Sequence, residues 1–212
     1  MDVKAVIFDL DGVICFTDKF HYRAWKALAD RLGIYFDEKI NDRLRGVSRM
    51  ASLEIILERS DKEYTQEEKE AFAEEKNNTY RELLKTMSPA DLTDEVKNTL
   101  VELRNRGYKL GIGSSSKNTK FILERIGLGD FFDAIADGTD ITHSKPDPEV
   151  FLIAAKKLGM EPTDCAVVED AKAGIEAAKA GNMTALALFG DAKGCGPEDY
   201  DLKSFSDLLN IL

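Results

Sequence analysis

The chain has few of the features that mark a secreted, membrane-bound or nucleic-acid-binding protein. Its three cysteines, Cys15, Cys165 and Cys195, lie far apart without a CxxC pair, so we expect reduced thiols in a cytoplasmic protein. No apolar run approaches the roughly 18 residues that a membrane span needs, and the opening MDVKAVIFDL does not resemble a signal peptide. With 29 basic and 39 acidic residues the net charge is -10, which argues against nucleic acid or a membrane surface as the main partner.

The composition is that of an ordinary globular protein. Of the 212 residues, 43% are hydrophobic and 32% are charged. This length suits one sizeable domain, or one domain that carries an insertion. We found no internal repeat and no low-complexity tract.

Five short apolar runs predict the strands of a parallel sheet. Their hydrophobicity is continuous, as expected of strands that are buried on both faces. Helical patterns such as SKNTKFILERIGL, PEVFLIAAKKLGM and AKAGIEAAKAGN separate the later runs. The alternation of strand and helix predicts an α/β fold with a doubly wound, Rossmann-like parallel sheet. The predicted strands are 4–8, 108–113, 134–136, 165–168 and 184–188.

The segment from about 17 to 90 interrupts this alternation. It contains helical stretches such as HYRAWKALADRL and TQEEKEAFAEEKNNTYRELL but no convincing strand. About 70 residues are too many for a simple crossover between two strands. We therefore expect an inserted all-helical cap domain at 16–90, with 1–15 and 91–212 forming the α/β core domain.

Acidic residues follow two of the predicted strands. Asp9 and Asp11 come after the first strand, and Glu169 and Asp170 end the fourth. The carboxyl ends of parallel strands meet at one edge of a sheet, which is where such folds bind ligands. Four carboxylates gathered there would repel one another without a cation, and oxygen ligands suit Mg²⁺. Each pair taken alone would be no more than an acidic turn.

The same edge is predicted to carry groups that bind anions. Ser114, Ser116, Lys117 and Asn118 follow the second strand, where hydroxyls and the free amides of a helix start would form an anion site. Lys145 lies in the proline-containing loop HSKPDPE, where its point charge suits a phosphate. Taken alone, the first group would be a helix cap and Lys145 a surface residue. Together with the acids they indicate phosphoryl transfer through a carboxylate nucleophile.

At these residues the chain resembles the haloacid dehalogenase superfamily of phosphotransferases. DLDGVI, SSS, SKPDP and VVED are similar to its four motifs and occur in the same order. The resemblance implies that Asp9 becomes a phospho-aspartate and that Asp11 acts as acid and base, with Ser114 and Lys145 completing the catalytic set. It further implies a magnesium ion on Asp9, the Asp11 backbone carbonyl and Asp170, with Glu169 nearby.

The stretches HYRAWKALA, RGVSR, SPADL, GSSSKN and FDAIAD resemble the β-phosphoglucomutases within that superfamily. This resemblance implies a monomer that interconverts β-glucose 1-phosphate and glucose 6-phosphate through β-glucose 1,6-bisphosphate. Arg49 offers a two-pronged donor for the phosphate distant from Asp9. Taken alone, Trp25 would be a packing residue of the cap, and Arg49 or Lys76 would be solvated surface residues. The substrate-binding residues implied are Thr17, His21, Trp25, Gly46, Val47, Ser48, Arg49, Ser52, Lys76, Ser116, Lys117 and Asn118.

Two other functions remain open at this stage. A magnesium-dependent phosphatase for a sugar phosphate or another small monoester would differ only in that water attacks phospho-Asp9. A phospho-acceptor signalling receiver would need its acceptor near Asp137, after the third strand, and would have no use for the helical insertion.

Cys15 and Phe16 stand where many relatives have polar residues, which bears on the polarity of the hinge and of the pocket beside Asp9.

Overall fold

The computed structural model describes residues 2–44 and 48–212 and divides into two compact units. The core unit comprises Met1–Phe16 and Met87–Leu212, and the cap unit comprises Thr17–Thr86. Phe16 and residues 87–90 therefore belong to the core unit, although we expected them in the insertion.

The core unit contains a six-stranded parallel sheet with the order β3-β2-β1-β4-β5-β6. The five predicted strands are present, which confirms the doubly wound α/β fold. The short edge strand β6 was not predicted, because its two exposed residues carry no apolar run. The strands are β1 Ala5–Phe8, β2 Lys109–Gly113, β3 Ala134–Ala136, β4 Cys165–Glu169, β5 Thr184–Ala187 and β6 Tyr200–Asp201.

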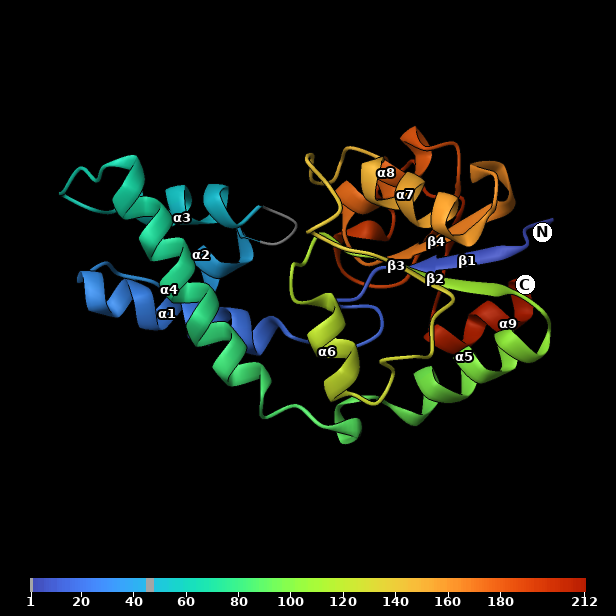
Figure 1. Ribbon diagram of the computed structural model, residues 1–212. Coiled ribbons are helices and arrows are strands. Elements are labelled where there is room, and N and C mark those ends of the chain that lie inside the picture. Colours follow the sequence, from blue (N-terminus) through green and yellow to red (C-terminus); the bar gives the residue numbers. More distant parts are fainter. Residues whose placement is uncertain (1, 45–47) are drawn as a thin grey trace. The chain divides into compact units, whose positions relative to one another are not determined.

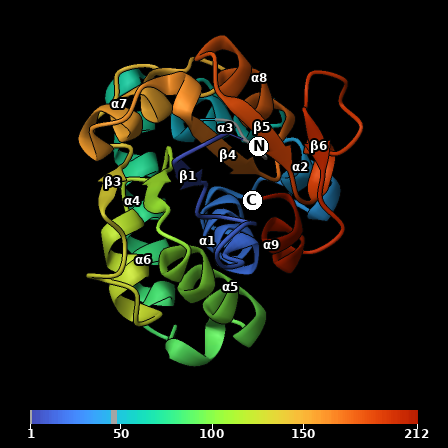
Figure 2. The same ribbon diagram turned by 90° about the vertical axis from the view of Figure 1, so that its right-hand side faces the viewer.

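Helices cover both faces of this sheet (Figures 1 and 2). On one face lie α7 (Glu149–Leu158) and α8 (Lys172–Ala180), and on the other lie α5 (Asp94–Asn105), α6 (Thr119–Arg125) and α9 (Leu208–Ile211). Short 3-10 turns occupy Pro89–Asp91, Pro162–Asp164, Gly190–Ala192 and Phe205–Asp207. Connecting loops, and not these helices, follow the strand ends at which the acidic residues lie.

The central strand β1 is buried on both sides. Ala5 and Ile7 pack into a cluster with Phe151 of α7, whereas the ring of Phe8 stacks on Phe205 of the opposite layer at 5.6 Å. All four side chains of β1 are fully buried. Because each large apolar side chain contributes about 1.5–3 kcal/mol when buried, this strand holds the end that carries Asp9 firmly in place.

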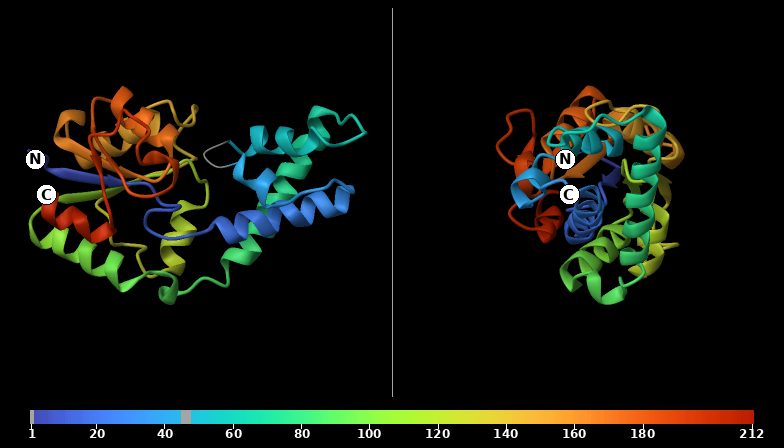
Figure 3. Two further views of the ribbon diagram at one scale, coloured as in Figure 1. Left: turned by 180° about the vertical axis from the view of Figure 1, so that it is seen from behind. Right: turned by 90° about the vertical axis from the view of Figure 1, so that its left-hand side faces the viewer.

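All regular elements in the described part of the cap unit are helices, namely α1 (Asp18–Leu32), α2 (Glu38–Asp42), α3 (Arg49–Leu57) and α4 (Gln66–Leu84). The long helices α1 and α4 pack side by side (Figure 3). A capping box between Thr65 and Glu68 begins α4, and Gly33 in a left-handed conformation ends α1. The cap has its own apolar cluster, which includes Trp25, Leu28 and Phe36.

Within residues 2–44 and 48–212 no helix combines the length and the apolar character required to cross a membrane.

Candidate active site

Three carboxylates converge at the carboxyl ends of β1 and β4. The Asp9 amide donates to the Val168 carbonyl at 3.0 Å, so the residue after β1 stays aligned with β4. One oxygen each from Asp9, Glu169 and Asp170 lies within 4.8 Å of the other two. Asp9 and Glu169 are buried, so their charges are poorly screened by water.

Lys145 lies between two of these acids. Its Nζ is 2.6 Å from Asp9 Oδ1 and 2.5 Å from Glu169 Oε1, and it also lies 4.6 Å from the centre of the Phe151 ring. Burial lowers the pKa of Lys145, but the charges of Asp9 and Glu169 outweigh it and raise that pKa above its ordinary value. The lysine therefore remains a cation beside Asp9 at any physiological pH.

Glu169 links the lysine to the start of α8. Its Oε2 accepts the Asp170 and Ala171 amides at 2.9 Å each, while Oε1 faces Lys145. A Cβ at Gly174 would overlap the Glu169 carboxylate, so glycine makes room for this group. Burial and the charge of Asp9 raise the pKa of Glu169, although Lys145 opposes them.

The acids have more negative charge than Lys145 can balance. Burial, and then the charges of Glu169 and Asp9, raise the pKa of Asp170 to about 8. Three converging carboxylate oxygens of this kind are a donor set that suits a hard divalent cation, which would relieve their repulsion. Gly12 brings the backbone close, since it has φ +83° and a Cβ there would overlap the Asp170 carboxylate.

Asp11 follows Asp9 by two residues. It pairs with Cys15 in a short parallel bridge, and the Gly12 amide donates to the Cys15 carbonyl at 2.8 Å. The Asp11 carboxylate is half-buried and is not one of the three converging groups, so its expected part in metal binding rests on the backbone carbonyl. Burial and the charges of Asp11 and Asp9 raise the pKa of Cys15 far above its ordinary value, which keeps this residue a neutral thiol.

The Ser114–Asn118 loop follows β2 at the same edge. Ser114 and Asn118 are buried, whereas Lys117 is exposed. The Ser116 amide donates to Ser114 Oγ, and the Asn118 amide donates to Ser116 Oγ, each at 3.2 Å. Local side chains therefore already accept from these two amides. The loop also carries hydroxyls and a lysine, and its part in binding an anion stays a prediction.

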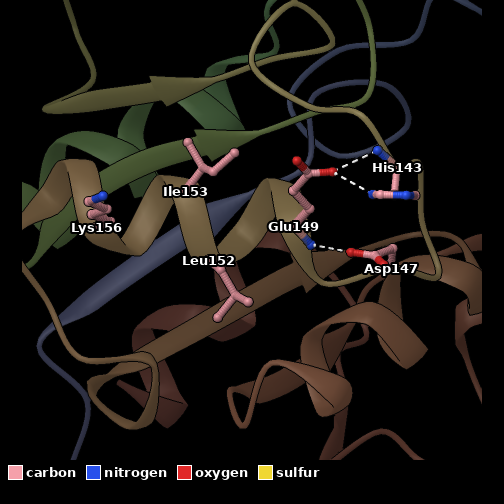
Figure 4. Close-up of a pocket in the computed structure, with 6 residues that line it drawn as sticks. All are labelled: His143, Asp147, Glu149, Leu152, Ile153 and Lys156. Carbon is pink, nitrogen blue, oxygen red and sulfur yellow. Dashed lines mark hydrogen bonds and ion pairs between the residues drawn. The ribbon is translucent and has the colours of Figure 1, made fainter.

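The loop that carries Lys145 is anchored at the first turn of α7 (Figure 4). Glu149 accepts the amides of Thr142 at 2.9 Å and His143 at 2.6 Å, while its own amide donates to Asp147 at 2.9 Å. A shallow pocket lies over this anchor, and none of the expected site residues lines it. Its lining residues are His143, Asp147, Glu149, Leu152, Ile153 and Lys156.

The cap unit holds a second polar cluster. Lys76 on α4 is buried, and its Nζ lies 2.9 Å from His21 Nδ1 on α1. The Lys76 ammonium also lies 4.6 Å from the Trp25 ring centre and 4.8 Å from that of Tyr80. Because an ammonium can only donate, Nδ1 accepts and His21 is neutral with its proton on Nε2. Burial and the charges of Lys76 and Arg49 hold the pKa of His21 well below its usual range.

Other expected cap residues surround this cluster. Arg49 begins α3, is half-buried and donates to Asn77 Oδ1 at 2.9 Å. Ser48 caps the same helix by accepting the Ala51 amide at 3.3 Å. The remaining expected residues are Thr17 before α1, which is buried, Ser52 and Trp25, which are buried in the cap, and Gly46 and Val47, which lie outside the described residues.

Sequence reasoning missed several residues that shape these clusters. Tyr80 and Asn77 were not singled out, although Tyr80 follows Lys76 by one helical turn and therefore shares its face of α4. Its ring stacks on His21 at 4.1 Å between centres. Phe151 and Gly174 were also missed, because only the folded chain brings them to Lys145 and Glu169.

Comparisons with known proteins agree with this architecture. The chain is 42% identical over 208 residues to a β-phosphoglucomutase of Bacillus subtilis, covering 97% of this chain and 92% of that protein. It is 34% identical over 182 residues to a fructose-1-phosphate phosphatase of Escherichia coli, covering 85% and 94%. The crystal structure of a β-phosphoglucomutase from Clostridium difficile matches with a TM-score of 0.89 and 39% identity, covering 97% and 93%. A family model for haloacid dehalogenase-like hydrolases matches residues 3–182, and the chain belongs to that family.

Proposed function

We propose that this chain is a monomeric, magnesium-dependent β-phosphoglucomutase. It interconverts β-D-glucose 1-phosphate and D-glucose 6-phosphate through phospho-Asp9 and β-glucose 1,6-bisphosphate. The similarity to the Bacillus subtilis enzyme over nearly the whole of both chains supports this reaction. The acids and the lysine of the core unit supply the chemistry that it needs.

Asp9 is the proposed nucleophile. Lys145 holds its Oδ1 at 2.6 Å, which fixes the carboxylate and leaves Oδ2 to attack phosphorus. Attack forms the Asp9–phosphorus bond and breaks the bond to the leaving sugar oxygen. A carboxylate nucleophile divides one slow displacement into two faster ones. The Lys145 cation and the serine hydroxyls of the Ser114–Asn118 loop would balance charge on the transferred oxygens.

Asp11 is the proposed acid and base. Protonated, it would donate to the sugar oxygen that leaves phosphorus as phospho-Asp9 forms. In the return step it would take the proton from the sugar hydroxyl that attacks phospho-Asp9. Gly12 has a positive φ and allows the turn that follows Asp11. Asp11 is thus close to Asp9 in the chain while lying in a more open environment, since it is half-buried.

The core acids are suited to hold magnesium. Asp9, Asp170 and the Asp11 carbonyl would bind it, with Glu169 supporting them. When bound, the cation would supply positive charge for the oxygens of the transferring phosphoryl group. Glu169 meanwhile keeps the Asp170 amide and Lys145 in place through its two oxygens.

The cationic cluster of the cap is the observation that carries the mutase proposal. A bisphosphate intermediate has a phosphate at each end, so a mutase needs a second anion site besides that at Asp9. The charges of Lys76 and Arg49 both act on His21 and lower its pKa. Arg49 supplies a fork for a phosphate, and Lys76 adds a second positive charge beside the neutral His21. We assign the second phosphate to this cluster.

A phosphatase that acts on a small sugar phosphate is the second candidate. The 34% identity to the Escherichia coli fructose-1-phosphate phosphatase favours it. The two reactions share every step up to phospho-Asp9. They differ in whether a sugar hydroxyl or water then attacks phosphorus, which depends on the exclusion of water.

Phosphorus NMR tests the proposal. The protein would receive β-glucose 1-phosphate, magnesium and a trace of β-glucose 1,6-bisphosphate, and the products would be followed with time. Accumulation of glucose 6-phosphate with little inorganic phosphate is the expected result. Release of inorganic phosphate in place of glucose 6-phosphate would establish the phosphatase instead.

A further inference from the structure

The turn that follows β3 lies directly against the Ser114–Asn118 loop. The Gly138 amide donates to the Ser116 carbonyl at 3.1 Å. One residue before this turn, the Ala136 carbonyl accepts the Ser114 amide at 3.1 Å. Two backbone hydrogen bonds thus hold both the first and the third residue of the loop against the turn.

The contact at Gly138 leaves no room for a side chain. A Cβ at this position would overlap the Ser115 carbonyl oxygen and lie 2.9 Å from the Lys117 amide nitrogen. Both neighbours are backbone atoms, so neither can rotate away as a side chain could. Any residue other than glycine must displace the loop, the turn or both.

The turn is itself built rigidly. The buried carboxylate of Asp137 accepts the Thr139 amide at 2.8 Å and the Thr139 hydroxyl at 2.6 Å. The Asp137 amide donates to Asp140 Oδ2 at 3.0 Å. Lys157 on α7 donates to that same oxygen and to the Ile135 carbonyl, each at 2.8 Å. The turn is therefore tied to both its strand and a helix, and it is the loop that is expected to yield.

We propose that the turn 137–140 sets the position of the Ser114–Asn118 loop, and that Gly138 is a positioning residue for phosphoryl transfer. Asp140 and Lys157 hold the turn in place, so they would affect the loop only through the turn. The inference rests on the proposed function in one respect, namely that the loop contacts the transferring phosphoryl group. A shift of about 1 Å in such a group can cost up to about a hundredfold in rate.

The test compares Gly138→Ala with Gly129→Ala. Gly129 is a matched control, because its added Cβ would meet mainly the flexible Glu124 side chain, at 3.3 Å. Two rates are measured in magnesium buffer. One is the isomerisation of β-glucose 1-phosphate, as kcat and KM. The other is phosphorylation of Asp9 by acetyl phosphate, followed by intact-protein mass spectrometry, in which acetate leaves as the Asp9–phosphorus bond forms.

We expect Gly138→Ala to lower kcat and the rate of Asp9 phosphorylation by about tenfold or more. KM should change less, because the cap cluster that is assigned the second phosphate is untouched. The thermal unfolding midpoint of Gly138→Ala should fall, because the overlap must be relieved, but should stay above the assay temperature. The rates of Gly129→Ala should stay near those of the original protein. Unchanged phosphorylation and kcat in folded Gly138→Ala would overturn the inference. If the original protein accepts phosphate from acetyl phosphate but isomerises nothing, the proposed function fails while the phosphorylation rates still decide the inference.

Lys157 provides the test if Gly138→Ala does not fold. Lys157→Met removes both hydrogen bonds to the turn from a partly exposed position on α7. We expect Asp9 phosphorylation to slow about threefold, with Lys157→Arg restoring most of the rate, since its guanidinium can still donate to Asp140. Equal rates in Lys157→Met and the original protein would then overturn the inference.

Discussion

Asp9, Lys145 and Glu169 form a buried ion cluster in which one lysine pairs with two acids. Lys145 contacts both acids, and Glu169 uses its second oxygen to hold two amides of the following turn. Breaking such a buried pair by removing one partner typically costs about 3–5 kcal/mol, because the remaining charge is left without compensation. Lys145 thus both orients Asp9 and makes its burial tolerable.

Replacement of Asp9 by asparagine should remove activity while leaving the fold. An asparagine side chain at this position cannot form an acyl phosphate, so we expect activity to fall by about a thousandfold or more. Intact-protein mass spectrometry after incubation with the bisphosphate should detect a phosphoryl adduct on the original protein only. The exposed Asp130→Asn serves as control and should behave like the original chain. A phosphoryl adduct on Asp9→Asn would assign the nucleophile elsewhere.

Asp170 should make magnesium binding depend on pH. Its pKa of about 8 lies above the ordinary value of 3.8, so without metal the folded protein binds an extra proton between those pH values. Because the folded state holds this proton and the unfolded state does not, falling pH stabilises the metal-free fold. A magnesium ion that binds Asp170 must displace the same proton. Magnesium affinity should rise by up to about tenfold per pH unit up to about pH 8 and then level off. Calorimetric titration with magnesium chloride measures this, and equal affinities at about pH 6 and pH 8 would contradict it.

At the scale of elements, the strands and their ends could be predicted from sequence, and the loops between them could not. Continuous apolar runs identify β1, β2 and β4 because both faces of these strands are buried. The ends of those strands then place Asp9, Ser114 and Glu169 at one edge of the sheet. The Gly138 contact has no comparable signal, since it joins two loops that are distant in sequence.

The first turn of α7 should fix the position of the loop 142–148, which carries Lys145. Glu149 accepts two amides of this loop, so Glu149→Ala would release it while leaving Lys145 itself intact. We expect kcat to fall about tenfold, because Lys145 would no longer be held against Asp9. Steady-state kinetics measure this change, with the exposed Glu161→Ala as control. A normal kcat in Glu149→Ala would mean that the Lys145 ion pairs alone fix the loop.

At the scale of the whole molecule, the sequence predicted an inserted helical segment but not its internal arrangement. Helical spacing places His21 and Trp25 on one face of α1 and gives Lys76 its place on α4. Tyr80 lies one helical turn from Lys76 on α4, a spacing that the sequence shows. That the Trp25 ring of α1 also contacts Lys76 follows from the packing of α1 against α4, for which the sequence has no local signal. Our proposal assigns one phosphate of the bisphosphate to groups of each unit.

The fate of phospho-Asp9 tests the central claim most directly. The enzyme would be phosphorylated with labelled β-glucose 1,6-bisphosphate, freed of sugar, and mixed in a rapid-quench apparatus with buffer or with β-glucose 1-phosphate. The account predicts that the sugar speeds loss of the label by about a hundredfold or more, and that the label appears in the bisphosphate. Equal rates with and without the sugar, with the label in inorganic phosphate, would contradict it.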